Sequence, residues 1–342
     1  MRQGAFLLFN DVDVMKVAVA GCGAVGSYYG AKLAQAGHEV HFLLRSDYEK
    51  VRRSGVFIRS PAGDFRARPL CALRPNEIGI ADVVLVALKT TANLRFEELL
   101  SPLVGPTSVV ITLQNGLGNE ELLAKIFPAK QIMGALCFVC LNRLKPGLIQ
   151  HLGHGQIVLG EFRGKPGRRA RGIADAFQDA GVPSKVSSNL AKAHWEKLVW
   201  NIPFNGLGVA SSAGLDAFAR RGGKLPARLG PCLTTEDLLR SGEWSGKVKA
   251  LMLEVIAIAR ALGFKIPRAL ADKQIERTRS MGPYRASTLI DFERCQPLEL
   301  KSLFLEPLRL AKSRKVAVPQ LEALCRILKA IDPGRTHRAK KR

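Results

Sequence analysis

The chain has 342 residues, with 52 Lys and Arg against 29 Asp and Glu, so its formal net charge is +23. Hydrophobic residues make up 47% of it and charged residues 24%, which indicates a folded protein rather than a disordered one, and the length predicts two domains. No apolar stretch approaches the roughly 20 residues that cross a bilayer, and residues 5–9 are too short for a secretory signal, so we expect a cytoplasmic protein.

Strands and helices alternate along the first half of the chain. Residues 1–14 are predicted to be a flexible extension, and Met15 is an alternative translation start. From there we expect apolar strands at 17–20, 39–44, 82–88 and 108–113, a helix at 26–36, and a hairpin at 56–70 that turns at 61–64. Continuous apolar strands alternating with helices predict an α/β fold with a doubly wound, largely parallel sheet, which we place at residues 15–165.

The pattern becomes helical after about residue 160. Amphipathic helices are predicted at 172–180, from 191 through 201 and onward, and at 247–262, 298–312 and 320–331. We therefore expect an all-helical domain at residues 166–332, followed by a basic tail at 333–342.

The glycine pattern after the first predicted strand indicates a dinucleotide site. Residues 21–26 read Gly-Cys-Gly-Ala-Val-Gly, which is G-x-G-x-x-G between a strand and a helix. Gly21 permits the tight turn, Gly23 lets the backbone approach the pyrophosphate, and Gly26 lets the helix close on the strand. Together with Cys22, Ala24 and Val25, these residues would offer the free N–H groups of a helix start to the phosphates.

The end of the second predicted strand favours NADP(H) over NAD(H). An NAD site usually carries an acid there, about 20 residues after the glycines, to bind the ribose diol. This chain has Arg45 instead, whose guanidinium suits a 2′-phosphate. The alternative is that Arg45 is a solvated loop residue.

Two further strand ends point to the same edge of the sheet. Lys89 follows the strand at 82–88, and Gln114-Asn115-Gly116 follows the strand at 108–113. Ligands lie at the carboxyl ends of the strands in open α/β sheets, so Lys89 would meet an anionic group and Asn115 the cofactor or substrate. A turn that only needs a positive φ angle is the competing interpretation for Asn115-Gly116.

A polar stripe on one helix predicts the catalytic site. Lys197, Asn201 and Asn205 stand at i, i+4 and i+8 among apolar neighbours, and polar groups are costly there unless they face a site. Pro203 should kink the helix. The competing interpretation is a surface stripe that ends at Asn205-Gly206.

Two polar residues nearer the C-terminus complete the candidate set. Ser287 could cap the turn that follows it, and Glu299 opens a predicted helix, where an acid is favoured by the helix dipole.

Cysteines and basic clusters carry no separate function in this interpretation. The seven cysteines are odd in number, and apolar residues flank the pair Cys137 and Cys140, so we interpret that pair as core residues and expect no metal site. Basic residues gather at 165–171, 220–228 and 335–342, which we interpret as solvated loops and tail without specific nucleic-acid binding.

Taken together, these motifs resemble the 2-dehydropantoate 2-reductase (ketopantoate reductase) family. The resemblance covers residues 16–330 and rests on the order of the glycine motif, Arg45, Leu88-Lys89-Thr90, Gln114-Asn115-Gly116, the Lys197 stripe, and Ser287 with Glu299. It implies a Rossmann domain that binds NADPH, followed by a helical domain like that of 6-phosphogluconate dehydrogenase. It also implies an NADP-dependent oxidoreductase that acts on CH–OH groups and reduces 2-dehydropantoate to (R)-pantoate, a step toward pantothenate and coenzyme A.

The resemblance also implies a role for each residue. Lys197 would be the general acid, and Glu299 would orient Lys197 or the substrate. Asn115, Asn201 and Asn205 would bind the substrate, with Asn115 also touching the cofactor, and Ser287 would bind the carboxylate. Lys89 would lie near the adenosine ribose phosphate.

The alternatives follow from where the chain departs from the family. Residues 208–212 stand where the family has an asparagine, so another 2-keto acid remains open as substrate. A related dehydrogenase for another hydroxy acid or for glycerol 3-phosphate is a second alternative, and a non-catalytic protein that binds NADP or nucleic acid is a third. The oligomeric state is open, with a homodimer as the assembly that we allow for.

Overall fold

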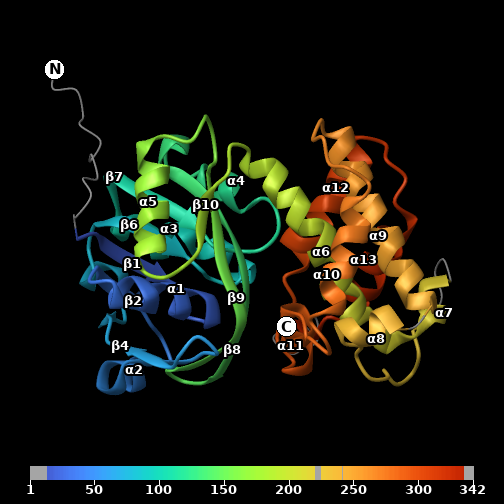
Figure 1. Cartoon of the computed structure of the whole chain (residues 1–342), viewed down its shortest axis with the longest axis horizontal. Helices are drawn as coiled ribbons and strands as arrows, with labels where there is room; N and C mark the ends of the chain where they lie inside the picture. The colour runs from blue at the N-terminus through green and yellow to red at the C-terminus, as the bar shows by residue number, and fades with distance from the viewer. Residues whose placement is uncertain (1–13, 220–224, 241, 335–342) are drawn as a thin grey trace. The chain divides into compact units, whose positions relative to one another are not determined.

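The computed structural model describes residues 14–219, 225–240 and 242–334 (Figure 1). Within them the chain divides into two compact units. The N-terminal unit comprises the described residues up to Asn115 together with Asn119–Leu190, and the C-terminal unit comprises Gly116–Gly118 and the described residues from Ala191 onward. The predicted extension at 1–14 and the basic tail at 333–342 lie almost wholly outside the described residues.

The N-terminal unit is built on one mixed sheet. Its described strands are β1 (Lys16–Ala20), β2 (Glu39–Leu43), β3 (Val56–Arg59), β4 (Phe65–Ala67), β5 (Leu70–Ala72), β6 (Ala81–Val86), β7 (Val104–Thr112), β8 (Ile132–Lys145), β9 (Leu148–Glu161) and β10 (Ser184–Val186). Its helices are α1 (Ala24–Gln35), α2 (Tyr48–Ser54), α3 (Phe96–Leu100), α4 (Asn119–Leu123) and α5 (Arg168–Asp179), with short 3₁₀ turns at η1 (Pro75–Glu77), η2 (Thr90–Arg95), η3 (Ser101–Leu103) and η4 (Ala129–Gln131). The predicted hairpin at 56–70 is confirmed, because β3 and β4 pair antiparallel.

The strand order places the glycine motif at a change of direction in the sheet. The order is β4-β3-β9-β8-β7-β6-β1-β2-β5, with β10 beside β9, and the run from β8 to β5 is parallel. From β1 the chain adds β2 and β5 on one side, and β6, β7 and β8 on the other. Such a switch point is where open α/β sheets bind their ligands.

Both faces of the sheet are covered, as the continuous apolar strands predict. On β1, Val17 and Val19 face one hydrophobic cluster, which includes α1 and α5, while Ala18 and Ala20 face a second cluster, which includes α3 and α4. The alternation follows from the two-residue period of a strand. The doubly wound fold class is therefore confirmed.

Within the described residues, the regular secondary structure of the C-terminal unit is all helical. Its elements are α6 (Leu190–Ala210), which begins at the last residue of the N-terminal unit, η5 (Ser211–Ala213), α7 (Leu215–Ala219), α8 (Thr235–Arg240), α9 (Gly242–Ala261), α10 (Leu270–Arg279), α11 (Ser287–Glu293), the π-helical turn η6 (Lys301–Leu305), α12 (Glu306–Ser313) and α13 (Pro319–Ile331). None of the helices in the described ranges is long and apolar enough to cross a membrane.

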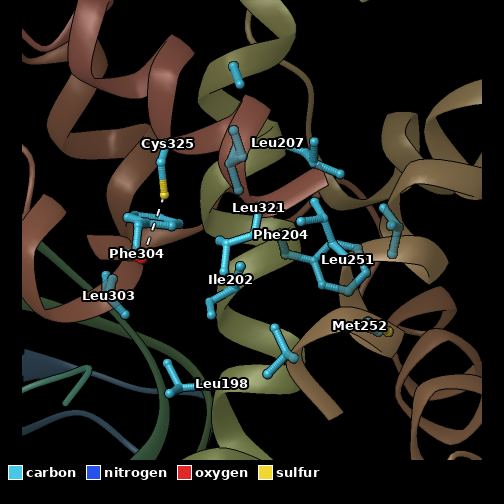
Figure 2. Packing of buried hydrophobic residues seen from close by; sticks show 14 of the residues in the cluster. Leu198, Ile202, Phe204, Leu207, Leu251, Met252, Leu303, Phe304, Leu321 and Cys325 are labelled. Atoms are coloured by element: carbon cyan, nitrogen blue, oxygen red, sulfur yellow. Dashed lines mark hydrogen bonds between the residues drawn. The ribbon is translucent and has the colours of Figure 1, made fainter. Parts of the chain in front are cut away.

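Helix α6 supplies the centre of the helical core. Figure 2 shows its side chains Leu198, Ile202, Phe204 and Leu207 among side chains from α9, η6 and α13, and the thiol of Cys325 donates to the carbonyl oxygen of Phe304 at 3.6 Å. Burying such side chains stabilises a fold by about 1.5–3 kcal/mol each. The residues of the polar stripe are therefore carried by a helix whose apolar side chains belong to the core of this unit.

The predicted domain boundary between residues 165 and 166 falls too early. Strand β10 pairs with β9, and residues of α5 such as Ile173 and Phe177 belong to the hydrophobic core of the sheet, so both elements belong to the N-terminal unit. The short strand β10 carries no strong apolar pattern, and pairing with a distant strand decides its place. The segment at 298–312 also differs from the single α-helix that the sequence predicts, because it contains the π-helical turn η6 before α12.

Candidate functional site

The glycine turn fits tightly against the strand beside it. Gly21 has a φ angle of +101°, and a Cβ atom there would lie 2.4 Å from the backbone nitrogen of Leu88. A Cβ atom on Gly26 would lie 2.3 Å from the carbonyl oxygen of Gly21 and 3.1 Å from Val19 Cγ1. The tight turn at Gly21 and the close approach of helix to strand at Gly26 are as predicted, since any side chain would force the backbone apart.

The middle glycine differs from the other two because it borders open space. A Cβ atom on Gly23 would meet nothing within 4 Å. Gly23 also holds the cap position of α1, where no side chain among the described residues supplies a capping hydrogen bond. The first helical hydrogen bond runs from Ser27 N to Gly23 O, so the preceding N–H groups stay available for an anion.

Cys22 is held in the turn by contacts of its thiol. Its thiol contacts the carbonyl oxygens of Val19 at 3.4 Å and Leu43 at 3.6 Å, which are the ends of β1 and β2. Burial raises the pKa of the Cys22 thiol well above its ordinary value. The side chain therefore stays neutral and holds the two strand ends together.

Arg45 is exposed just beyond the end of β2. The acid two residues further on, Asp47, is buried and forms an ion pair with Arg143, whose Nε also donates to Asp47 Oδ2 at 3.0 Å. Ser46 Oγ donates to the same carboxylate at 3.1 Å. Because these contacts neutralise the carboxylate, it does not oppose an anion beside Arg45.

The turns after β6 and β7 are joined by one side chain. Lys89 is exposed and holds the cap position of η2, and Gln114 Nε2 donates to the carbonyl oxygen of Leu88 at 2.8 Å. Asn115, partly buried, follows Gln114 directly. The structure thus brings the Lys89 turn and the Asn115 turn to the same edge, beside the glycine turn.

These four strand ends form a site with the features of a dinucleotide cradle. Because β1, β2, β6 and β7 are parallel, their carboxyl ends meet at one edge of the sheet. That edge carries open space at Gly23, uncapped helical N–H groups and the exposed cation of Arg45. The residues present therefore fit a phosphorylated dinucleotide.

The polar stripe of α6 is enclosed rather than solvated. Asn201 and Asn205 are 6% and 4% exposed, and Lys197 is half-buried. The helix continues through Pro203 to Ala210, so it does not end at Asn205-Gly206, and the surface-stripe interpretation is wrong. Buried amides of this kind must have hydrogen-bond partners.

Asn205 meets the residue predicted to bind the substrate carboxylate. Its Oδ1 accepts hydrogen bonds from Ser287 Oγ at 3.2 Å and from the backbone nitrogen of Thr288 at 3.1 Å. These donors lie in the first turn of α11, whose cap position is Ala286. Asn205 therefore caps α11 from another helix, and the expectation that Ser287 caps the turn is wrong, since its hydroxyl points to Asn205 instead.

Glu299 lies at the start of the helical run that contains η6. It is 8% exposed, and its carbonyl oxygen accepts from Leu303 N at 3.3 Å. The π-helical turn that follows presents the carbonyl oxygen of Ser302 to Leu117 N at 3.0 Å. A Cβ atom on Gly116 would lie 2.5 Å from that same oxygen, so only glycine lets the segment Gly116–Gly118 dock there.

The candidate residues thus divide between the two units, and in the C-terminal unit the structure joins Asn205 to Ser287. The glycine turn, Arg45, Lys89 and Asn115 share the sheet edge of the N-terminal unit, while the α6 stripe, Ser287 and Glu299 belong to the C-terminal unit. The sequence did not identify the pair of Asp47 with Arg143, which stand 96 residues apart, nor the hydrogen bond that Asn93 Nδ2 donates to Asn119 Oδ1. The only sequence signal for these contacts was the spacing of Asn119, which stands four residues after Asn115 at the start of a helix.

Comparisons with known proteins agree across both units. A family described as "Ketopantoate reductase PanE/ApbA" matches residues 17–164, and its C-terminal counterpart matches residues 229–332. A protein of Nostoc sp. strain PCC 7120 named 2-dehydropantoate 2-reductase is 40% identical over 93% of this chain and 95% of its own length.

Solved structures show the same fold. A crystal structure of 2-dehydropantoate 2-reductase from Geobacter metallireducens GS-15 has a TM-score of 0.83 at 41% identity, covering 92% of this chain and 99% of that one. A D-mandelate dehydrogenase bound to NADH and anilino(oxo)acetate has a TM-score of 0.79 at 20% identity, covering 93% and 98%, and shows the fold alone. The chain therefore belongs to the ketopantoate reductase family and is an oxidoreductase that acts on CH–OH groups.

Proposed function

We propose that this enzyme reduces 2-dehydropantoate to (R)-pantoate with NADPH, in the route to pantothenate and coenzyme A. The observation that carries the proposal is the 40% identity over 93% of the chain to a protein named 2-dehydropantoate 2-reductase. The motifs of both units support it. A cytoplasmic location and a homodimeric assembly stay predictions from the sequence.

The sheet edge would bind the dinucleotide. The N–H groups at the start of α1 would hold its pyrophosphate beside Gly23, and Arg45 would bind the 2′-phosphate. Lys89 would meet the ribose phosphate region, and Asn115 the nicotinamide end and the substrate. When bound, the reduced nicotinamide supplies the hydride that adds to the keto carbon.

Lys197 would act as the proton donor. Hydride addition moves the carbonyl electrons onto the keto oxygen, and the Lys197 ammonium donates its proton to that oxygen as the charge develops. Its partly buried position supports this role, because limited solvation favours proton transfer from an ammonium. Glu299 would orient Lys197 or the substrate.

The buried amides would bind the rest of the substrate. Asn201 and Asn205 lie on the same helix face as Lys197, and Ser287 is already joined to Asn205. Since Asn205 Oδ1 accepts from Ser287 and Thr288, its Nδ2 group is the part that we assign to the substrate. Ser287 would bind the carboxylate.

A second candidate is the reduction of another 2-keto acid. Where the family has an asparagine, this chain has Ser211 and Ser212, whose hydroxyls donate to the backbone oxygens of Gly208 at 2.9 Å and Val209 at 2.8 Å. These hydroxyls therefore hold the end of α6 rather than replace a substrate amide. Loss of the asparagine amide that the family has at this place would change the substrate preference if that amide binds the substrate.

The decisive experiment is steady-state oxidation of NADPH by the purified protein with 2-dehydropantoate and with a panel of 2-keto acids. We expect the highest kcat/KM with 2-dehydropantoate, and a lower value with NADH than with NADPH. A higher kcat/KM for another 2-keto acid would favour the second candidate. No turnover with any of them would contradict the proposed function.

A further inference from the structure

Three amide side chains form a continuous chain of hydrogen bonds at the sheet edge. Gln114 Nε2 donates to Asn93 Oδ1 at 2.8 Å, Asn93 Nδ2 donates to Asn119 Oδ1 at 2.9 Å, and Asn119 Nδ2 donates to the carbonyl oxygen of Asn115 at 3.2 Å. We call Gln114, Asn93 and Asn119 the amide relay. All of it lies in the N-terminal unit.

The relay is anchored at its first member. Thr112 Oγ1 donates to Gln114 Oε1 at 3.1 Å and accepts from Gln114 N at 3.2 Å. Gln114 Nε2 also donates to the carbonyl oxygen of Leu88 at 2.8 Å. Thr112, Gln114 and Asn119 are 1%, 5% and 1% exposed, so water cannot easily replace these partners.

Every step of the relay runs in the same direction. Each amide accepts with its oxygen from the preceding group and donates with its nitrogen to the next, so the orientation of each one sets that of its neighbour. A carboxamide offers an acceptor oxygen and a donor nitrogen side by side, whereas a carboxylate of the same shape would replace the donor by a second acceptor. Asn93 is half-buried and the other two members are buried, and networks of this kind are rigid when every member is satisfied.

The relay joins the two turns that carry predicted ligand residues. At one end it holds the carbonyl oxygen of Leu88, directly before Lys89, and at the other it holds the carbonyl oxygen of Asn115. Asn93 comes from η2 and Asn119 from the start of α4, so the relay ties residues 88–93 to residues 112–119. None of these contacts is needed to form the strands themselves.

We propose that Gln114, Asn93 and Asn119 are positioning residues, which hold Lys89 and Asn115 at the spacing required by the dinucleotide. This inference rests on the proposed function in one respect, that a dinucleotide binds at this edge. The residues act through Lys89 and Asn115 and need not touch the ligand.

The first test breaks the relay next to Asn115. Asn119→Asp removes the donor to the Asn115 carbonyl oxygen and places an acceptor against it, so we expect the dissociation constant for NADPH to rise about tenfold and kcat to fall about tenfold. Asn76→Asp is the matched control, because Asn76 is exposed on η1 and gains the same charge. Binding is measured by quenching of tryptophan fluorescence with NADPH alone, and kcat by NADPH oxidation.

The second test asks whether the relay acts as a unit. Asn93→Ala and Asn119→Ala each interrupt the relay without adding a charge, so the double variant Asn93→Ala/Asn119→Ala should lose much less affinity for NADPH than the product of the two single losses. Hydrogen exchange in the ligand-free protein should be faster in peptides that cover residues 113–119. Fully multiplicative losses with unchanged exchange would overturn the proposal.

A milder pair of variants provides a test if the variants of Asn93 and Asn119 do not fold. Thr112→Val removes the hydroxyl that orients Gln114 with little change in volume, and Thr112→Ser restores a hydroxyl. We expect weaker NADPH binding in the valine variant and wild-type binding in the serine variant. Equal binding by both, or by Asn119→Asp and Asn76→Asp, would overturn the positioning role.

The outcomes separate this inference from the proposed function. If the wild-type protein binds NADPH but does not reduce 2-dehydropantoate, the proposed substrate is wrong. The binding and exchange measurements would still test whether the relay positions Lys89 and Asn115. Wild-type protein that binds neither NADPH nor NADH would overturn both.

Discussion

The two units build their polar sites in different ways. In the N-terminal unit, the candidate site is an edge of backbone turns, where parallel strands end together and glycines leave N–H groups open. In the C-terminal unit, it is a row of side chains on one buried helix, held by a second helix far along the chain. A site made of backbone groups requires positions with no side chain or a small one, whereas a site made of side chains requires particular functional groups. Substitutions should therefore impair binding in the first unit and chemistry in the second.

The largest expected effect is at the proposed proton donor. Lys197→Ala should lower kcat by about 10²- to 10⁴-fold, the usual contribution of a general acid, with a smaller change in the KM for NADPH. The matched control is Lys192→Ala on the same helix, whose ammonium lies 3.6 Å from Glu196 on an exposed face. Steady-state kinetics checks both variants, and unchanged kcat in Lys197→Ala would remove the proposed chemistry.

Two glycines of one turn should separate folding from binding. Gly23→Ala adds a methyl group to open space, so the free energy of unfolding should hardly change while NADPH binding is lost by about 100-fold, because the backbone no longer approaches the phosphates. Gly21→Ala should instead destabilise the fold itself, since its Cβ atom would overlap the backbone of Leu88. Denaturation and NADPH titration distinguish the two, and normal affinity in Gly23→Ala would place the pyrophosphate elsewhere.

Arg45 tests the choice of dinucleotide. Arg45→Ala should raise the KM for NADPH by about 10- to 100-fold, the effect of losing a hydrogen-bonded charge pair, and leave that for NADH nearly unchanged. Arg59→Ala removes another exposed arginine of the same unit and should affect neither. Equal effects of Arg45→Ala on the two cofactors would contradict the assignment.

Variants of Asn205 test whether this one residue both caps α11 and binds the substrate. Asn205→Ala removes the acceptor for Ser287 and Thr288 and should lower the free energy of unfolding by about 1–2 kcal/mol. Asn205→Asp keeps an acceptor oxygen and should retain most of that stability, yet lose the Nδ2 donor assigned to the substrate. Denaturation and the KM for 2-dehydropantoate are the two measurements; full activity in Asn205→Asp would confine Asn205 to capping.

The smallest expected effect is a pH dependence of stability in the N-terminal unit. His151 is buried against Tyr28, with Nδ1 2.9 Å from Ser60 Oγ, and burial lowers its pKa. As the pH falls through the ordinary value of about 6.5, the unfolded chain takes up the proton first, so this contribution to stability is present above that pH and is lost below it.

Thermal unfolding at pH 7.5 and pH 5.5 measures this effect. The decrease in Tm on acidification should be smaller in His151→Asn than in the wild type. His154→Asn is the control, because His154 is exposed and asparagine tolerates its φ angle of 62°. An identical decrease in all three proteins would show that His151 does not contribute.

Sequence patterns predicted the features that depend on neighbours along the chain. The glycine turn, the strand ends at Arg45, Lys89 and Asn115, and the i, i+4, i+8 stripe all follow from local periodicity or from one short motif. Even the fold class follows, since apolar runs alternating with helices leave few other arrangements. The domain boundary did not, because β10 is too short to give a signal and is placed by its pairing with β9.

By itself, the sequence determined the doubly wound sheet, the location of the glycine turn and the helix that carries Lys197. Only the tertiary structure decided that Asn205 caps α11 across 82 residues, that Asp47 is neutralised by Arg143 across 96, and that Gln114, Asn93 and Asn119 form one relay. The physical reason is that periodicity records which face of an element is buried. A hydrogen bond between distant residues leaves no periodic trace, because its partners are brought together only when the elements pack.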